Sequence, residues 1–200
     1  MSTWPTSPAT ERNRGPILEV LLRHFADRKH VLELGSGTGE HAVFFAGALP
    51  HLLWQPSDMA DHVPMLQARV ADSGLSNLLP PLELDGRRSR WPIERCDAVF
   101  CANVLHIAAW PSVEKLFEGI GRVLASGGVV AVYGPFRQGG HATAPSNAVF
   151  DDWLRARDPD SGVRDIEAVF ALAESVGLSL REDVAMPANN RCLLWHRAVA

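Results

Sequence analysis

A glycine-rich turn that follows a short apolar run constrains this chain more than any other feature. Residues 31–41 read Val-Leu-Glu-Leu-Gly-Ser-Gly-Thr-Gly-Glu-His, and an apolar, helix-like stretch follows over residues 42–49. Glycine suits a backbone that turns sharply or that a ligand approaches closely. The free N–H groups at the start of the next helix form a polar cradle. A strand, a glycine turn and a helix in this order predict a nucleotide-binding site.

The spacing of the glycines narrows that prediction. A dinucleotide fingerprint is G-x-G-x-x-G, whereas this turn is G-x-G-x-G and carries Glu40 where the third glycine is expected. The pattern E-x-G-x-G-x-G resembles the first motif of class I S-adenosyl-L-methionine (SAM)-dependent methyltransferases. This resemblance implies that the loop wraps the methionine end of SAM; the alternative is a glycine turn without a ligand. The candidate cofactor-binding residues of this segment are Glu33, Gly35, Ser36, Gly37, Gly39 and His41.

Composition limits the class of protein. The chain has 200 residues, 46% of them hydrophobic and 21% charged, which suits one globular domain with a substantial core. A net charge of -4 provides no basic footprint for nucleic acid, and no apolar run reaches the length of about 20 residues that a membrane helix needs. The start of the sequence lacks the apolar core of a signal peptide. Cys96, Cys101 and Cys192 show no metal-ligand spacing, so we expect a reducing, cytoplasmic setting.

Strands and helices alternate along the chain. Residues 1–15 predict an N-terminal arm or lid, with residues 1–10 extended and a helix beginning at Pro16, because proline suits a first helical turn. Residues 137–147 are rich in glycine and predict a mobile loop. Further helices are expected over 42–49, 61–72, from Trp110 to Gly127, over 147–155 and over 165–176; strands are expected over 31–34, 51–56, 78–84, 96–102, 129–133, 178–186 and 191–197.

The order of these elements favours one fold class. Strand and helix alternation that closes with a hairpin matches the class I methyltransferase plan. We therefore expect a single α/β domain over residues 1–200, with a three-layer Rossmann-like fold and a seven-stranded, mostly parallel sheet that ends in a C-terminal antiparallel hairpin. A dinucleotide-binding oxidoreductase fold would not usually end this way.

Two carboxylates follow expected strands. Asp58 lies 19 residues after Gly39, near the spacing of an acid that accepts hydrogen bonds from both ribose hydroxyls. The alternative for Asp58 is an N-cap for the helix that starts near Ala60. Asp85 stands where class I methyltransferases commonly accept from the adenine amino group, and the alternative is a turn-forming Asp-Gly pair. The neighbouring Met59 and Gly86 are included in the same candidate cofactor site.

A third group of candidates follows the two central strands. Ligands of open α/β sheets bind beyond the carboxyl ends of the strands, which places Asn103, Val104 and His106 at the same mouth as the glycine loop. The resemblance to methyltransferases implies that residues here border the transferred methyl group. His106 has the side chain best suited to a general base, and Tyr133 is the second choice. The alternative for His106 is a buried, hydrogen-bonded histidine at the start of a helix.

Blocks spread over almost the whole chain resemble a small family of uncharacterised methyltransferase-like proteins found in bacteria and animals. The family resemblance implies the fold and SAM binding, and it implies no substrate. The matching blocks are Arg12-Asn13 with Ile17-Leu18, residues 36–41, residues 54–58, residues 103–107 with Trp110, residues 133–136, Ser146-Asn147 with Phe150-Asp151, Asp158-Pro159 with Arg164-Asp165, and residues 186–190.

Polar side chains near the expected mouth suggest what it binds. We expect Asn13 to contact the cofactor; amides can recognise a polar small molecule, and arginines can hold a carboxylate or phosphate. Arg191 is a further arginine nearby. The candidate substrate-binding residues are Arg12, Arg14, Arg137, Asn147, Asn189 and Asn190.

The favoured function is therefore a SAM-dependent methyltransferase that acts on a small polar molecule by in-line methyl transfer, as a monomer or homodimer. A non-catalytic SAM-binding or partner-binding protein on the same fold is the alternative, and a nicotinamide-dependent oxidoreductase is disfavoured by the glycine spacing. A metal site at His41, His106 and His141 is not expected, because no two of them stand four residues apart on one helix.

Overall fold

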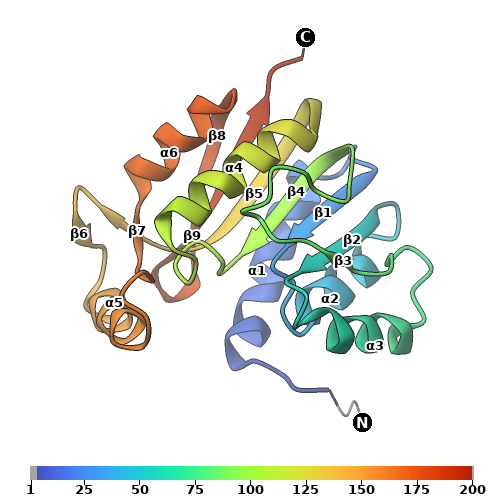
Figure 1. The fold of residues 1–200 in the computed structure, drawn as a ribbon, viewed down its shortest axis with the longest axis horizontal. Helices are drawn as coiled ribbons and strands as arrows, with labels where there is room; N and C mark the ends of the chain where they lie inside the picture. Colours follow the sequence, from blue (N-terminus) through green and yellow to red (C-terminus); the bar gives the residue numbers. More distant parts are fainter. Residues whose placement is uncertain (1–3, 200) are drawn as a thin grey trace.

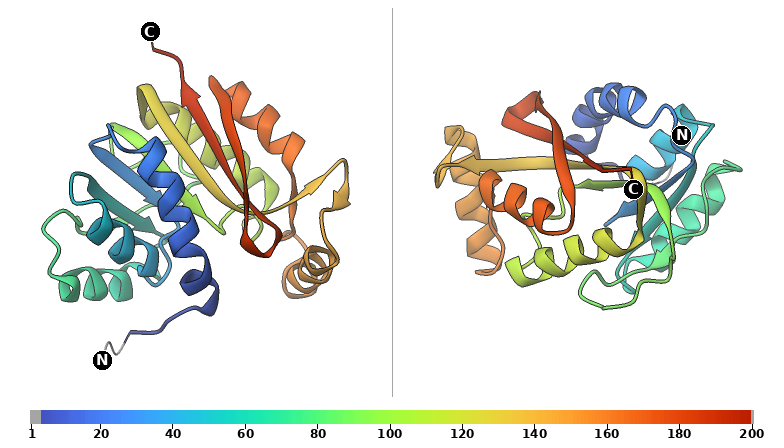
Figure 2. Two further views of the ribbon diagram at one scale, coloured as in Figure 1. Left: turned by 180° about the vertical axis from the view of Figure 1, so that it is seen from behind. Right: turned by 90° about the horizontal axis from the view of Figure 1, so that it is seen from above.

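The computed structural model describes residues 4–199, in which helices and strands form an α/β fold of three layers. A twisted sheet forms the middle layer, α1, α2 and α3 cover one face, and α4 and α6 cover the other (Figures 1 and 2). The helices are α1 (Pro8–His24), α2 (Glu40–Ala48), α3 (Val63–Ser73), α4 (Trp110–Val123), α5 (Pro145–Arg157), α6 (Ile166–Ser175) and the short 3₁₀ helix η1 (Pro187–Asn189).

The sheet has the predicted topology. Its strands are β1 (His30–Leu34), β2 (Leu53–Asp58), β3 (Leu82–Glu83), β4 (Cys96–Ala102), β5 (Leu124–Gln138), β6 (His141–Ala142), β7 (Arg164–Asp165), β8 (Leu178–Met186) and β9 (Asn190–Arg197). The main path runs β3-β2-β1-β4-β5-β9-β8, in which the first five strands are parallel and β9 is antiparallel to both β5 and β8. The expected mostly parallel sheet with a closing antiparallel hairpin is therefore confirmed, and its main path has the expected seven strands, while the two further strands β6 and β7 pair with β5 off this path.

Alternating side chains of β5 separate two hydrophobic cores. Val130 and Val132 pack towards α4 and α6, whereas Val129, Ala131 and Tyr133 pack towards α1 and α2. Period-two alternation places successive residues on opposite faces of a strand, and both faces are covered here, so the strand is apolar throughout. Each large aliphatic side chain buried in this way contributes roughly 1.5–3 kcal/mol to folding.

The start of α1 corrects the sequence prediction. The helix begins at Pro8 rather than Pro16, so residues 8–15 are helical and the segment ahead of α1 in the described chain is residues 4–7. Ser7 caps the helix, and its backbone N–H donates to Glu40 Oε2 at 2.8 Å. Pro16 lies inside the helix, where it lacks the N–H that would bond to Arg12. The prediction is wrong because Pro16, which suits a first helical turn, lies two turns inside α1, whereas the N-cap residue is Ser7.

Three other boundaries also differ from the expectation. The helix after Trp110 ends at Val123, ahead of the glycine pair at 127–128, because β5 already pairs with β4 at Leu124. β5 extends to Gln138 because its last residues pair with β6 and β7, which also replaces part of the expected loop over 137–147. β3 is reduced to residues 82–83, and Leu78 contributes an isolated bridge to Trp54.

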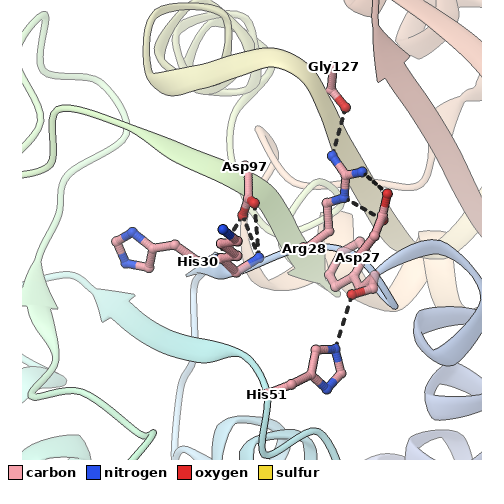
Figure 3. A network of polar contacts seen from close by, with 8 residues as sticks. Asp27, Arg28, His30, His51, Asp97 and Gly127 are labelled. Atoms are coloured by element: carbon pink, nitrogen blue, oxygen red, sulfur yellow. Dashed lines mark hydrogen bonds and ion pairs between the residues drawn. The ribbon is translucent and has the colours of Figure 1, made fainter.

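The amino ends of the strands are held by short local contacts (Figure 3). The Asp97 carboxylate accepts hydrogen bonds from the backbone N–H groups of Lys29 at 2.9 Å and His30 at 2.8 Å. Arg28 donates to the Gly127 carbonyl at 2.9 Å and is paired with the neighbouring Asp27. These contacts tie the loop before β1 to β4 and β5. Among residues 4–199, none of the helices combines the length and apolar character needed to cross a membrane.

Candidate functional site

A cavity of about 470 Å³ opens at the carboxyl ends of β1, β2 and β4, the edge opposite the contacts of Figure 3. This is the edge at which parallel α/β sheets bind ligands. Eight predicted cofactor-binding residues line the cavity together with His62, Arg87, Ile107 and Ser112. The eight are Gly35, Gly37, Asp58, Met59, Asp85, Gly86, Asn103 and Val104.

The glycine loop needs its glycines for two separate reasons. Gly35, Gly37 and Gly39 have φ angles of 68°, 54° and 79°, in the left-handed region that side chains rarely adopt. A Cβ atom at Gly35 would also lie 2.5 Å from Cγ2 of Val104, which lines the cavity. Gly39 is the N-cap of α2, so the loop delivers the start of that helix beside the cavity. The predicted strand, turn and helix are therefore present.

Asp58 sits at the centre of this edge. Its carboxylate accepts from the backbone N–H of Gly37 at 2.6 Å, from its neighbour Met59 at 2.7 Å and contacts the His62 ring at 2.8 Å. Helix α3 has His62 as its N-cap residue, with no side-chain cap hydrogen bond. The N-cap alternative for Asp58 is therefore not realised, and the carboxylate faces the cavity.

Asp85 forms a tight pair with Arg87 across the turn that follows β3. Its Oδ1 accepts from Arg87 Nε at 2.8 Å, and its Oδ2 accepts from Arg87 Nη2 at the same distance. The hydrogen bonds from Arg87 lower the pKa of the Asp85 carboxyl below its usual value. Asp85 thus forms the turn that was the alternative interpretation, and it lines the cavity as well.

Asn103 follows β4 in a strained conformation. Its φ is 59°, and a non-glycine residue held there costs roughly 1–3 kcal/mol. The backbone N–H of Asn103 donates to the Tyr133 carbonyl at 2.9 Å, which joins the ends of β4 and β5. The chain then turns directly into the cavity wall at Val104. Such strain persists only where the surrounding structure fixes the backbone, so the packing around Asn103 holds this residue at the cavity edge.

The wall that continues from Asn103 is fixed by a segment to which the sequence analysis assigned no role. Four consecutive carbonyls, those of residues 105–108, accept hydrogen bonds from residues 161–164. Arg164 donates to Leu105 and Ala108, Gly162 N–H donates to His106 at 2.8 Å, and Ser161 Oγ donates to Ile107 at 3.0 Å. We call residues 161–164 the carbonyl clamp. Its signal was the Arg164 block, which the family resemblance had marked without a role.

His106 lies beside the cavity in an apolar environment. It is 6% exposed, its ring meets Phe150 edge-on with centroids 5.3 Å apart, and its Nδ1 lies 3.7 Å from where a Cβ of Gly134 would stand. Burial, with a smaller contribution from Arg164, lowers the pKa of His106 to about 4. The imidazole is therefore neutral at ordinary pH and only weakly basic.

Glu33 and Ser36 support the glycine loop from behind. Glu33 accepts from Trp54 Nε1 at 2.8 Å, and burial raises the pKa of its carboxyl to about 7. Ser36 Oγ accepts from the backbone N–H of Ser57 at 3.1 Å, which ties the loop to β2. Both side chains are buried and neither lines the cavity, so they shape the loop rather than touch its contents.

A second buried polar group joins α1 to α2 and β5. The His41 ring contacts Asn13 Oδ1 at 2.8 Å, and burial lowers the pKa of His41 to about 4. Asn13 also hydrogen-bonds the Tyr133 hydroxyl, whose pKa is raised mainly by burial. The structure therefore brings Asn13, His41 and Tyr133 together, beside the cavity lining rather than within it.

The predicted substrate-binding residues are largely engaged in contacts of their own. The Arg14 guanidinium lies 4.8 Å from the centroid of the Phe44 ring, and Arg137 pairs with Asp151 at 3.8 Å. Asn147 donates to the Asn189 carbonyl at 3.0 Å. The remaining contacts are Asn189 with Ser146, Asn190 with the carbonyls of Pro187 and Ala188, and Arg191 with Asp183, while Arg12 is exposed on α1.

The three cysteines take no part in this edge chemistry. Cys96, Cys101 and Cys192 are free and buried, and burial raises the pKa of each thiol to about 12. Thiols of this kind are unreactive because the thiolate is the nucleophile.

Solved structures share this architecture. An O-methyltransferase family protein from Burkholderia thailandensis aligns with a TM-score of 0.82 at 15% identity, over 93% of this chain and 56% of its own. The S-adenosylmethionine-dependent methyltransferase SibL aligns with a TM-score of 0.80 at 20% identity, over 95% and 56%. PigF with SAH aligns with a TM-score of 0.77 at 15% identity, over 91% and 61%. This chain spans 56–61% of the length of these proteins, and the likeness establishes the Rossmann-like methyltransferase fold.

The sequence comparison covers nearly the whole chain. The match runs over residues 4–197, which includes the glycine loop, the cavity wall and the carbonyl clamp. The chain therefore belongs to the family described as "Protein of unknown function (DUF938)".

Proposed function

We propose that this protein is a SAM-dependent methyltransferase that acts on a small molecule. The observation that carries the proposal is the cavity at the carboxyl edge, in which Gly35 and Gly37 face the Asp58 carboxylate. Two of the three structural neighbours are named as methyltransferases, and PigF was solved with SAH. That likeness supports the cofactor class, while the substrate is argued from this chain alone.

The residues of the cavity fit an adenosyl cofactor. Beyond the adjacent residues, nothing in the described part of the chain lies within 4 Å of where a Cβ of Gly37 would stand, so the backbone there is open to a ligand in the cavity, and the carboxylate of Asp58 is a natural acceptor for ribose hydroxyls. Asp85 would accept from the adenine amino group, with Met59 and Gly86 beside the base. Asn103 and Val104 would line the methionine end. The supporting residues Glu33, Ser36, Gly39, His41 and Asn13 would keep the loop and α1 in place.

SAM, when bound, supplies a methyl group on a sulfonium leaving group. The protein's own part is to orient the two reactants, exclude water and hold a proton where needed. His106 is neutral and can accept a proton, but with a pKa of about 4 it is a weak base. We therefore propose that His106 orients an acceptor atom that is already nucleophilic. Tyr133, with its raised pKa, would act as a hydrogen-bond donor.

We propose a small acceptor because the polar groups beside the cavity are few and already organised. Arg12 is the exposed arginine of the predicted set, whereas Arg137 and Arg191 are paired with Asp151 and Asp183. An acceptor held by amides and ring edges fits these contacts better than a strongly acidic one. The Asn147 and Asn189 pair is the candidate for these amide contacts.

Calorimetric titration with SAM, SAH and NADH in parallel tests the cofactor. We expect binding of both adenosyl ligands and none of NADH, and we expect Asp58→Ala to weaken SAH binding by at least about tenfold because the ribose loses its acceptor. Lys115→Ala, a change on the exposed face of α4, is the matched control. Binding of NADH alone would overturn the proposal.

A labelled-methyl screen over small-molecule acceptors then separates an enzyme from a binding protein. With an acceptor in hand, His106→Ala should slow turnover while SAM affinity stays within a few-fold. Unchanged turnover would remove His106 from the reaction. Tight SAH binding without transfer to any acceptor would favour the non-catalytic alternative.

A further inference from the structure

The carboxylate of Asp58 is nearly saturated in this structure. It accepts from Gly37 N at 2.6 Å and from Met59 N at 2.7 Å, and its Oδ1 contacts His62 Nδ1 at 2.8 Å. An ionised carboxylate has roughly four lone-pair sites for hydrogen bonds. Three donors leave about one free site, whereas the two hydroxyls of a ribose need two. One of the present donors must therefore leave when a ribose binds.

The three donors differ in how easily they can leave. Gly37 N and Met59 N belong to the backbone, and the glycine loop is fixed by hydrogen bonds from Ser36 N to Ser57 O at 3.0 Å and from Gly39 N to Ser36 O at 2.8 Å. The His62 side chain is 57% exposed, while the Asp58 side chain is 8% exposed. A half-exposed ring can rotate into water without opening the fold, so His62 is the donor that can be displaced.

His62 also stands in the right place to be displaced by a ligand. It is the residue ahead of α3 and lines the same cavity as Asp58 and Gly37. Its ring nitrogen faces a carboxylate oxygen, so Nδ1 carries the proton and donates. A ribose hydroxyl on Oδ1 would take the position of that donor.

We propose that His62 occupies the ribose position of the ligand-free protein and is displaced when an adenosyl ligand binds. The inference rests on the proposed function, because it takes the ligand to be SAM or SAH. Because of this competition, the apparent affinity for the adenosyl ligand equals the intrinsic affinity multiplied by the fraction of protein in which His62 has left the carboxylate. His62 is thus a specificity-determining residue: only a ligand with a vicinal diol recovers what the displacement costs.

Two ligands and two variants test the proposal. The ligands are SAH and its 2′-deoxy analogue, which lacks one of the two hydroxyls. The variants are His62→Ala, which removes the competing donor, and His62→Gln, whose amide can still donate to Asp58. We expect His62→Ala to bind SAH about three- to tenfold more tightly than the wild type, as the loss of one competing hydrogen bond predicts. The deoxy analogue should gain less than about twofold, and His62→Gln should resemble the wild type.

A direct readout on the wild-type protein accompanies the affinities. The His62 ring resonances, assigned by their absence in His62→Ala, should move on addition of SAH towards those of a solvent-exposed imidazole. Equal or weaker SAH binding by His62→Ala, or ring resonances that stay in place, would overturn the proposal while the cofactor assignment stands. Failure of the wild type to bind SAH at all would overturn both.

Discussion

The two ends of the sheet are built in opposite ways. At the amino end, Asp97 and Arg28 bind backbone groups of adjacent segments, and the left-handed positions there are glycines such as Gly74. At the carboxyl end stand the non-glycine residues with positive φ among residues 4–199, which are Asn103, Ala188 and Asn189. Buried groups with displaced pKa values also gather there, namely Glu33, His41 and His106.

The two ends therefore differ in how much backbone strain and how many buried ionisable groups the surrounding packing must support. At the amino end, Asp97 and Arg28 bind backbone groups of segments distant in the sequence, and the residues with positive φ are glycines, while the buried His30 Nε2 has no hydrogen-bond partner within residues 4–199. The carboxyl end holds strained backbone and buried ionisable groups, which persist only because the surrounding packing fixes them. Such departures from local preference are expected at functional sites. The comparison therefore supports the carboxyl end as the candidate ligand-binding edge, independently of any likeness to other proteins.

The largest expected effect concerns two glycines at opposite ends of the sheet that have nearly the same φ angle. Gly35 and Gly74 have φ angles of 68° and 66°, but a Cβ at Gly35 meets Val104 at 2.5 Å whereas nothing lies within 4 Å of one at Gly74. Both alanine variants should lose about 1–2 kcal/mol from backbone strain. Only Gly35→Ala should also weaken SAH binding, by at least about tenfold. Calorimetry with urea unfolding measures both, and equal SAH affinities would contradict the prediction.

The second prediction uses the displaced pKa of Glu33. In the folded protein the Glu33 carboxyl has a pKa of about 7, against an ordinary value of 4.5. The buried, protonated carboxyl therefore contributes fully to stability below pH 4.5, and this contribution is lost as the pH rises to about 7. Glu33→Gln cannot ionise. The variant should therefore gain up to about 3 kcal/mol relative to wild type between these pH values.

Urea unfolding of both proteins from pH 4.5 to 8 checks this. The difference between the two curves removes the opposite contributions of His41 and His106, which lose stability as pH falls from 6.5 towards 4. Parallel curves would mean that Glu33 is not protonated in the folded state.

The third prediction concerns the carbonyl clamp. Arg164→Met removes the donors to Leu105, Ala108 and Asp160, and we expect a loss of about 2 kcal/mol with faster amide exchange over residues 104–109. Weaker SAH binding should follow because this segment lines the cavity. Arg157→Met, an exposed residue of α5 whose guanidinium lies over the half-exposed Trp153 ring, is the control. Unchanged amide exchange over residues 104–109 in Arg164→Met would show that the carbonyl clamp does not stabilise this segment.

The smallest expected effect lies at the amino end. Asp97→Ala removes the acceptor for Lys29 N and His30 N and should cost about 1–2 kcal/mol. SAH affinity per folded molecule should stay within about twofold, because the change lies at the edge away from the cavity. Thermal unfolding and calorimetry measure the two quantities. A tenfold loss of SAH affinity in Asp97→Ala would contradict the view that the amino end of the sheet does not affect ligand binding.

Much of the fold could be predicted because its signals are local. The run over 31–41 specified a strand, a turn and a helix, and the alternation of elements specified the sheet. The start of α1 was missed because it depends on Ser7 and its contact with Glu40, a residue far along the chain. The length of β5 was missed because its end is defined by pairing with β6 and β7.

Less of the candidate site than of the fold could be predicted from the sequence. The rule for parallel sheets predicts that residues after each strand share one edge, and eight of the predicted residues line the cavity there. The roles of Glu33 and Ser36 could not be predicted, since whether a residue beside a glycine faces the ligand or the core depends on three-dimensional packing. The carbonyl clamp likewise joins segments more than 50 residues apart, which no spacing reveals, whereas His62 stands four residues after Asp58 and its contact could have been found from that spacing.

The long strand β5 has a consequence for how this family can diversify. Beyond the sheet it carries β6 and α5, and α5 contacts the fold through Asn147, which donates to the Asn189 carbonyl, and through Phe150, whose ring meets His106, before the chain reaches the carbonyl clamp. Residues 139–157 therefore form a loop closed at both ends by fixed anchors. Insertions or replacements there can change the surroundings of an acceptor while the cofactor edge keeps its geometry. Sequence length should vary more in this interval than anywhere else between the glycine loop and β8.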